Sequence, residues 1–223
     1  MSSRISPFVN EGFYHTFNRG VAKQPTFIID SDYRQALFTM RYYQTIKPAV
    51  KLSRYKSLSK SDQNRILSSL VLQPKLVDIV AYVLMPNHWH FLLRQNVNNG
   101  ITIFLSRFTN SYTRYYNTRH NRVGHLFQGV FKSVEIESEE QLLHVSRYIH
   151  LNPLVSSLIY KSHLITYPWS SFPEFISGNS AITNPDYVLH RFGDKFNYEN
   201  FVLNHSDYAR ELELIKHATI DLE

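Results

Sequence analysis

The chain has 223 residues, of which 43% are hydrophobic and 14% aromatic, and this composition is typical of a folded protein with a sizeable core. It contains no cysteine, which excludes disulfides, thiolate zinc sites and cysteine nucleophiles. The net charge of +6 favours an anionic partner, of which nucleic acid is the commonest. There is no signal-peptide pattern at the N-terminus and no run of about 18 apolar residues. We therefore predict a cytoplasmic protein with no membrane partner.

Hydrophobic periodicity and capping residues predict most of the secondary structure. Helices are expected at 30–43, at 99–120 and from Ser138 to about Asn152, where Pro153 should stop the last one. Strands are expected at 13–18, 76–84, 88–95 and 126–136. This order predicts an α+β fold with a ferredoxin-like βαββαβ core, a mostly antiparallel sheet with its helices on one face, and one added helix.

The rest of the chain divides around this core. We predict a domain at 1–154 that carries a polar, basic insertion at 46–75, with a short helix at 61–72. The remaining residues, 155–223, are rich in turn signals, and we expect an extension of irregular structure and short helices packed on the core.

Two histidines, His88 and His90, follow a turn at Met85-Pro86-Asn87 and lie in a predicted strand. Alternate side chains of a strand share one face, so both imidazoles point one way while Trp89 points the other way. Two imidazoles side by side on a strand could form half of a metal site. The alternative is a pair of partly buried histidines that only make hydrogen bonds.

A second pair, Tyr148 and Asn152, is spaced four residues apart and therefore shares one face of the last core helix. A tyrosine phenol is a weak nucleophile at neutral pH, but beside a metal-polarised phosphate it can form a phosphotyrosine. Asn152 could offer a carbonyl oxygen as a third metal ligand. A packing role for Tyr148 is the alternative. The other candidate tyrosines have spacings that favour a core stripe; they are Tyr112, Tyr115 and Tyr116.

Several basic side chains lie on or after the long predicted helix. On sequence alone, contact with phosphate groups and a merely solvated face are equally favoured for them. These residues are Arg107, Arg114, Arg119, Arg122 and Lys132.

Four segments in order resemble the single-tyrosine HUH transposases (IS200-like), where HUH means His, bulky hydrophobic, His. The likeness is closest to the branch associated with repetitive extragenic palindromes (REP), and it covers roughly the first 155 residues. The segments are His15-Thr-Phe-Asn-Arg-Gly20, Leu84-Met-Pro-Asn-His-Trp-His-Phe-Leu-Leu93, Arg122-Val-Gly-His-Leu-Phe-Gln-Gly-Val-Phe-Lys-Ser133 and Arg147-Tyr-Ile-His-Leu-Asn-Pro153.

The resemblance implies an enzyme that cleaves single-stranded DNA near a hairpin and rejoins strands, with Tyr148 becoming joined to the 5′-phosphate. His88 and His90 would hold Mg²⁺ or Mn²⁺, with Asn152 at the family's third-ligand position. Imidazole suits Mn²⁺ better than Mg²⁺. Asn18 and Arg19 would lie near the bound DNA, and related proteins suggest a homodimer.

Two other functions are open on the sequence. A domesticated relative could bind a DNA or RNA hairpin without cutting it, which would not require His88, His90 and Tyr148 together. A metal hydrolase could act through bound water, with Tyr148 incidental. The joint presence of all three residues favours the transposase-like enzyme.

Overall fold

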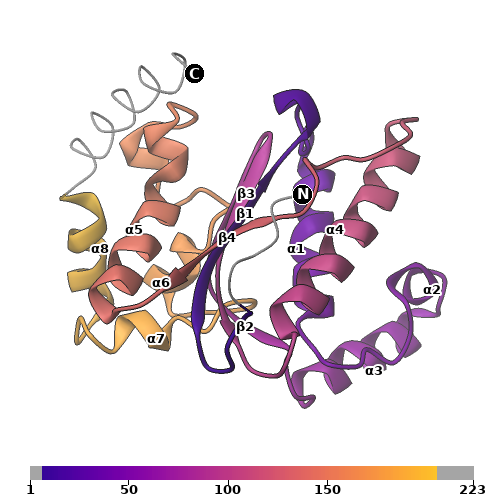
Figure 1. Ribbon diagram of the computed structural model, residues 1–223, viewed down its shortest axis with the longest axis horizontal. Coiled ribbons are helices and arrows are strands. Elements are labelled where there is room, and N and C mark those ends of the chain that lie inside the picture. Colours follow the sequence, from indigo (N-terminus) through magenta and orange to yellow (C-terminus); the bar gives the residue numbers. More distant parts are fainter. Residues whose placement is uncertain (1–6, 205–223) are drawn as a thin grey trace.

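Four antiparallel strands form one sheet in residues 7–204, the part of the chain that the computed structural model describes (Figure 1). The strand order β2-β3-β1-β4 and the antiparallel pairing of all three neighbours are those of a ferredoxin-like βαββαβ core. The predicted α+β fold is therefore confirmed. The strands are β1 (Phe13–Arg19), β2 (Val77–Met85), β3 (His88–Gln95) and β4 (Lys132–Ile136).

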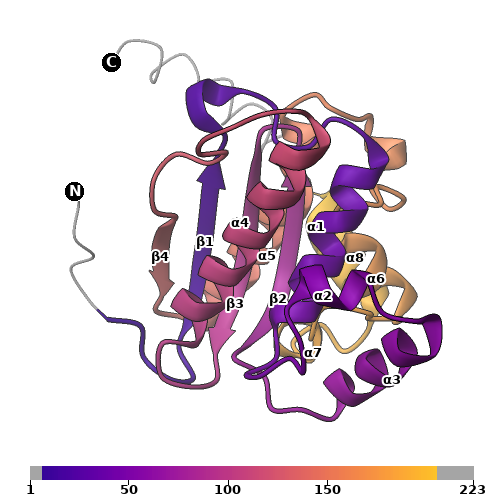
Figure 2. The ribbon, with the colours of Figure 1, turned by 90° about the vertical axis from the view of Figure 1, so that its right-hand side faces the viewer.

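Helices cover both faces of the sheet, so the prediction of helices on one face is wrong. One face packs against α1 (Asp30–Tyr43) and α4 (Gly100–Arg119), which lie in front of the sheet in Figure 2. The other packs against α5 (Glu139–Val155). The cause is visible in β2, where all nine residues are buried, because a strand that is apolar on both sides needs cover on both sides.

The two faces have separate cores, which we call the α4 face and the α5 face. Trp89 and Phe91 of β3 point into the α4 face, beside Phe108 of α4. Leu92 of β3 points into the α5 face, beside Ile149 of α5. Strand alternation thus divides one strand between two environments.

The predicted insertion contains two helices where one was expected. They are α2 (Leu52–Lys56) and α3 (Lys60–Val71), and they close a small apolar cluster of their own with Tyr42 of α1. Arg107 of α4 donates hydrogen bonds to the carbonyl oxygens of Thr45 and Ile46, which fixes the start of this segment.

Two predicted boundaries are wrong. The strand expected at 126–136 begins only at Lys132, because Phe127 forms an isolated bridge with Gly20 and is buried in the α4 face. The helix expected to stop at Pro153 continues to Val155. Proline lacks one N–H and has a fixed φ near −65°, which is compatible with helix, so at the last turn it removes only one internal hydrogen bond.

The segment after α5 closes the free edge of β2. The backbone N–H of Leu84 donates to Trp169 O, and that of Asn184 donates to Ile79 O, both at 2.8 Å. Four short helices follow, η2 (Lys161–His163), α6 (Phe172–Ser177), α7 (Asp186–Leu189) and α8 (Lys195–Leu203). Of these, α7 and α8 pack against α5, and α6 packs against α8 (Figure 1). The rest of the predicted extension, 205–223, lies outside the described residues.

Within residues 7–204, no helix is both long enough and apolar enough to cross a membrane.

Candidate active site

The β2–β3 hairpin brings His88 and His90 onto the α5 face. A two-residue turn, Pro86-Asn87, connects the strands, and His88 is the first residue of β3. The two imidazole rings lie 5.0 Å apart between centroids and are almost perpendicular, at 87°. Trp89 between them in sequence points to the opposite face and is fully buried. The alternation expected from the sequence therefore holds in the structure.

Asn87 orients the first of these rings. Its side-chain oxygen lies 2.7 Å from Nδ1 of His88, while its Nδ2 donates to Lys23 O at 3.1 Å. Because the Nδ2 bond fixes which end of the amide is oxygen, and an amide oxygen only accepts, Nδ1 of His88 carries the proton. The Nε2 lone pair of neutral His88 is then available to a metal ion.

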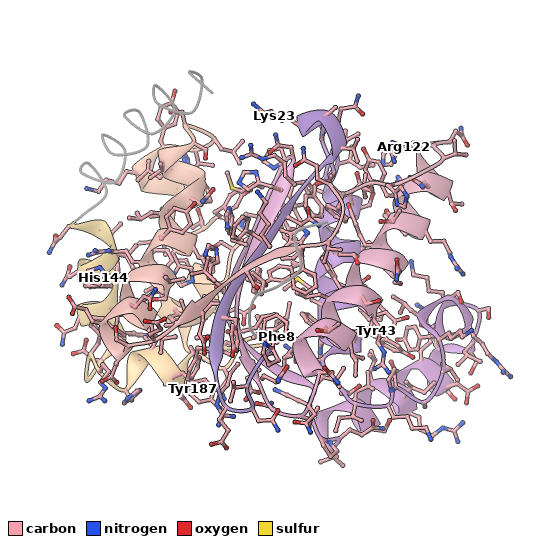
Figure 3. All side chains as sticks on the ribbon, viewed as in Figure 1. Phe8, Lys23, Tyr43, Arg122, His144 and Tyr187 are labelled. Atoms are coloured by element: carbon pink, nitrogen blue, oxygen red, sulfur yellow. The ribbon has the colours of Figure 1, made fainter. Side chains whose placement is uncertain are left out.

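A tight loop after β1 supports Asn87 from the other side. The N–H of Gly20 donates to Asn87 O at 2.7 Å, and η1 (Val21–Lys23) follows directly. A Cβ at Gly20 would lie 2.2 Å from Gln24 O, so no other residue fits without moving the loop. Figure 3 shows Lys23 of this loop at the end of the molecule where Arg122 also lies.

Helix α5 brings Tyr148 and Asn152 to the same place. The Tyr148 ring meets the His90 ring edge-on, with centroids 5.6 Å apart, and its side chain remains 37% exposed. Asn152 lies one turn further along and is buried beside His88. Tyr148, Asn152 and the two histidines are therefore gathered in space as the sequence predicts.

The side-chain oxygen of Asn152 is buried and has no hydrogen-bond partner of good geometry among the described residues. A buried polar atom without a partner is costly, and such atoms recur where a ligand supplies the missing contact. Because the helix continues through Pro153, Asn152 keeps helical geometry and its side chain faces the sheet. The amide sits beside His88 and raises the pKa of that ring against the stronger effect of burial.

Burial keeps the imidazoles neutral. Removal from water lowers the pKa of His88 to about 4, and the charge of Arg19 contributes in the same direction. The pKa of His90 is lowered well below 6.5 by burial first, and then by the neighbouring rings of His15 and His88 and the charge of Arg19. Neutral imidazoles are the form that binds metal ions.

These residues fit a divalent cation with open coordination positions. Two imidazole nitrogens and one unpartnered amide oxygen suit Mn²⁺, and Mg²⁺ less well. No cluster of three or more histidine, cysteine, aspartate or glutamate side chains that could hold a metal occurs in the described part of the chain. The protein donors are therefore few and uncharged, which leaves room for anionic oxygens of a substrate.

Two basic side chains lie on the same face as the histidines. Arg19 is exposed at the end of β1 and pairs in register with His88, while Lys132 is exposed and pairs with Phe17. Asn18, predicted near DNA, points instead into the α4 face: it accepts from Arg19 N at 2.8 Å and lies 3.5 Å from Gly129 O.

The remaining predicted DNA-binding residues lie on or after α4, across the sheet from the histidines. Arg107 donates to backbone carbonyls at the start of the insertion, and Arg122 donates to Asn117 Oδ1 on α4 and to His125 O in the following loop. Arg114 is exposed on α4. The structure thus brings Arg19 and Lys132 to the site but not these three arginines.

The other tyrosines lie away from the histidines. Tyr112 and Tyr116 are buried in the α4 face, and their hydroxyls donate to the carbonyls of Thr26 and Pro25. Tyr115 donates to Ser31 O on the same side of the sheet. The prediction of a core stripe is confirmed for these three residues.

Sequence reasoning missed two residues of the site. Asn87 was assigned only to a turn, and His15, quoted inside the first motif, received no role. His15 has the same strand parity as Arg19, so it lies on the α5 face, where its Nε2 is 2.9 Å from Nδ1 of His90. Parity along β1 was the available signal, but the pairing of β1 with β3 was needed to interpret it.

The antiparallel sheet carries paired histidines on its central strand β3 and a tyrosine on the adjacent helix α5. A family comparison identifies the class of protein to which this arrangement belongs. The chain matches a family model described as "Transposase IS200 like" over residues 27–152, more than half of its length. The chain belongs to the IS200-like transposase family, as the motifs predict.

A solved structure also resembles this chain. It is described as "Structure of the REP associates tyrosine transposase bound to a REP hairpin", with a TM-score of 0.50 and 14% sequence identity. The match covers 82% of this chain and 91% of that one. At this identity the likeness supports the fold. No curated protein matches the chain.

Proposed function

We propose that this protein is a metal-dependent endonuclease and strand transferase that acts on single-stranded DNA carrying a hairpin. Membership of the IS200-like transposase family supports the reaction class. The hairpin partner is supported by the similar structure, whose description names a bound REP hairpin. The positive net charge of +6 agrees with an anionic partner. A homodimer and a cytoplasmic location remain part of the proposal.

One observation carries the assignment. A half-exposed tyrosine, two neutral imidazoles and an unpartnered buried amide oxygen converge on one spot of the sheet. A ligand at this spot would account for both the oxygen of Asn152 and the exposure of Tyr148.

We assign the nucleophile to Tyr148. Its hydroxyl oxygen forms a bond to the phosphorus, the bond from phosphorus to the 3′ oxygen breaks, and the 5′-phosphate remains on the protein. The phenol proton passes to water, and the departing 3′ oxygen takes up a proton to become a hydroxyl. Its exposure lets a DNA strand reach the hydroxyl without opening the core.

Mg²⁺ or Mn²⁺, held by His88, His90 and Asn152, would supply Lewis-acid stabilisation of charge on the phosphate. Arg19 and Lys132, which flank the histidines on the same face, would contact neighbouring phosphates. Asn18 would then act indirectly, by fixing the backbone N–H of Arg19. Arg107, Arg114 and Arg122 would reach only DNA that extends across to α4.

The alternative is a relative that binds a DNA or RNA hairpin without cutting. It needs the basic residues but gives no reason for an unpartnered oxygen at Asn152. A hydrolase that uses bound water needs the histidines but not Tyr148. A protein–DNA adduct separates the three functions.

The test is incubation with hairpin-bearing single-stranded DNA and Mn²⁺, followed by denaturing electrophoresis. Wild-type protein should give a denaturant-stable adduct that is absent from Tyr148→Phe and from His88→Ala. The matched control is Tyr160→Phe, which removes the same atom from a tyrosine that is 80% exposed on the extension. It should form the adduct like wild type.

The outcomes distinguish the functions. Cleavage that survives Tyr148→Phe would overturn the nucleophile assignment and favour the hydrolase. Hairpin binding by wild type without cleavage, across a panel of hairpins, would favour the binding module.

A further inference from the structure

His15 lies inside the candidate site without a part in the proposed reaction. It is on β1, where its register partners are Leu92 on β3 and Val134 on β4. Its ring also meets the Tyr148 ring edge-on, with centroids 5.8 Å apart. A polar ring in this position requires an explanation, because it is partly buried among other side chains.

The relative orientation of the His15 and His90 rings identifies the kind of hydrogen bond that joins them. The distance between Nε2 of His15 and Nδ1 of His90 is 2.9 Å, while the ring centroids are 5.1 Å apart and the planes differ by 23°. A centroid separation this long at such a short nitrogen–nitrogen distance means that the rings meet edge to edge. This is an in-plane N–H···N hydrogen bond, since ring lone pairs and N–H bonds lie in the ring plane.

An N–H···N hydrogen bond joins one N–H to one lone pair, so one of the two rings donates and the other accepts. If His15 donated, Nδ1 of His90 would hold the lone pair and Nε2 would carry the proton. If His90 donates, its Nε2 lone pair is free. The two arrangements differ in whether His90 can bind a metal through Nε2.

We propose that His15 is a positioning residue that accepts the Nδ1 proton of His90, and so presents the Nε2 lone pair of His90 to the divalent cation. The metal-binding part rests on the proposed function. The tautomer part rests on the hydrogen bond and on the orientation of His88, and it does not depend on the proposed function.

The other histidine supports this assignment. Nδ1 of His88 faces Asn87, which only accepts at that position, so Nε2 is the free atom of His88. With His15 as acceptor, both rings are held by Nδ1 and both offer Nε2. Partners that fix the second ring nitrogen usually orient metal-bound histidines in this way.

The direct experiment is ¹⁵N–¹H NMR of metal-free, full-length protein with labelled histidine, in which the coupling pattern distinguishes the tautomers. We expect the proton of His90 on Nδ1 in wild type. A proton on Nε2 would overturn the proposal, whatever the protein does with metal or DNA.

Three variants test the consequence for metal binding, measured as Mn²⁺ affinity by electron paramagnetic resonance of free Mn²⁺. His15→Leu removes the acceptor and should weaken binding roughly 10- to 100-fold. His15→Gln places an amide oxygen within reach of Nδ1 and should restore affinity. Phe17→Leu, the packing control, alters a ring that stacks 5.7 Å from His90 without a hydrogen bond, and should leave affinity unchanged.

Two further results decide between the inference and the function on which it rests. Equal Mn²⁺ affinity in wild type and His15→Leu overturns the positioning role. If wild type binds no Mn²⁺, the proposed metal site fails, while the NMR spectrum still decides whether His15 accepts from His90.

Discussion

The two faces of the sheet bury side chains of different character. On the α4 face, Trp89 stacks on Phe91 at 4.3 Å and meets Phe108 edge-on at 5.8 Å, so aromatic packing fills the core. On the α5 face, the same strand contributes His88 and His90. The His88 ring forms a hydrogen bond with Asn87, and the His90 ring forms one with His15.

This difference shows that one strand can carry both stability and chemistry, because successive residues point to opposite sides. The α4 face fixes the backbone of β3 through packing. The α5 face then uses that rigid backbone to hold imidazoles whose burial alone is unfavourable. Changes on the two faces should therefore affect different properties, and four predictions test this.

Trp89→Ala should have the largest effect and should act on stability. Removing a fully buried aromatic ring typically costs about 3–5 kcal/mol of unfolding free energy. Urea denaturation measures the loss. Trp89→Phe should cost much less, because the indole N–H has no hydrogen-bond partner among the described residues. Phe196→Ala, at a ring that is 63% exposed, should change stability by under about 0.5 kcal/mol. A small loss in Trp89→Ala would mean that the α4 face does not dominate stability.

Acid should destabilise the α5 side selectively. The pKa values of His15 and His88 are lowered from 6.5 to about 4, so between these values the unfolded chain binds protons that the folded protein rejects. The free energy of unfolding is therefore highest above pH 6.5. It falls as the pH drops toward 4, by at most about 3 kcal/mol per ring. His150, which is buried between Ser171 and Tyr198 with a pKa lowered to about 3, acts in the same direction.

Urea unfolding at pH about 7.5 and about 5 measures this slope. His15→Gln should flatten it, because the variant removes one of the rings. Phe108→Leu, which changes only the α4 face, should lower stability equally at both pH values. An unchanged slope in His15→Gln would contradict the burial of a neutral imidazole at this position.

Asn152→Leu should stabilise the metal-free protein by about 1–2 kcal/mol, because it replaces a buried oxygen that has no hydrogen bond of good geometry within residues 7–204 by an apolar group of similar size. The same variant should lose Mn²⁺ affinity. The matched control is Asn117→Leu: both ends of that amide are bonded, to Gly124 O and to Arg122, so stability should fall. Destabilisation by Asn152→Leu would show that this oxygen is already satisfied within the fold.

The sequence pattern was sufficient to predict the bounds of those helices and strands whose structure depends mainly on their own residues. The predicted bounds of β3 and α1 agree with the structure, because alternation marks the first and helical spacing the second. The start of β4 was wrong, because Phe127 has the apolar character of a strand residue but forms only one isolated bridge. Apolar sequence shows that a residue is buried, not which hydrogen bonds its backbone makes.

The site residues that lie within single strands or helices were predictable, whereas the contacts between different strands were not. His88, His90, Tyr148 and Asn152 follow from spacing within single elements and from family resemblance. The contact of His15 with His90 joins positions 75 residues apart and depends on strand register. The separation of Asn18 from Arg19 onto opposite faces follows from parity, which the motif as a string does not show.

The smallest expected effect comes from removing one positive charge from each face of the sheet and comparing the two variants. Arg19 lies beside His88, whereas Arg114 is exposed across the sheet on α4. Arg19→Ala should weaken hairpin binding a few-fold and lower the salt slope by about 0.7, the value for one phosphate of a single strand. Arg114→Ala removes the same charge and should leave both nearly unchanged. Fluorescence anisotropy over a range of salt concentrations measures them. Equal losses in the two variants would mean that DNA extends over both sides of the sheet, and that the α5 face does not account for binding by itself.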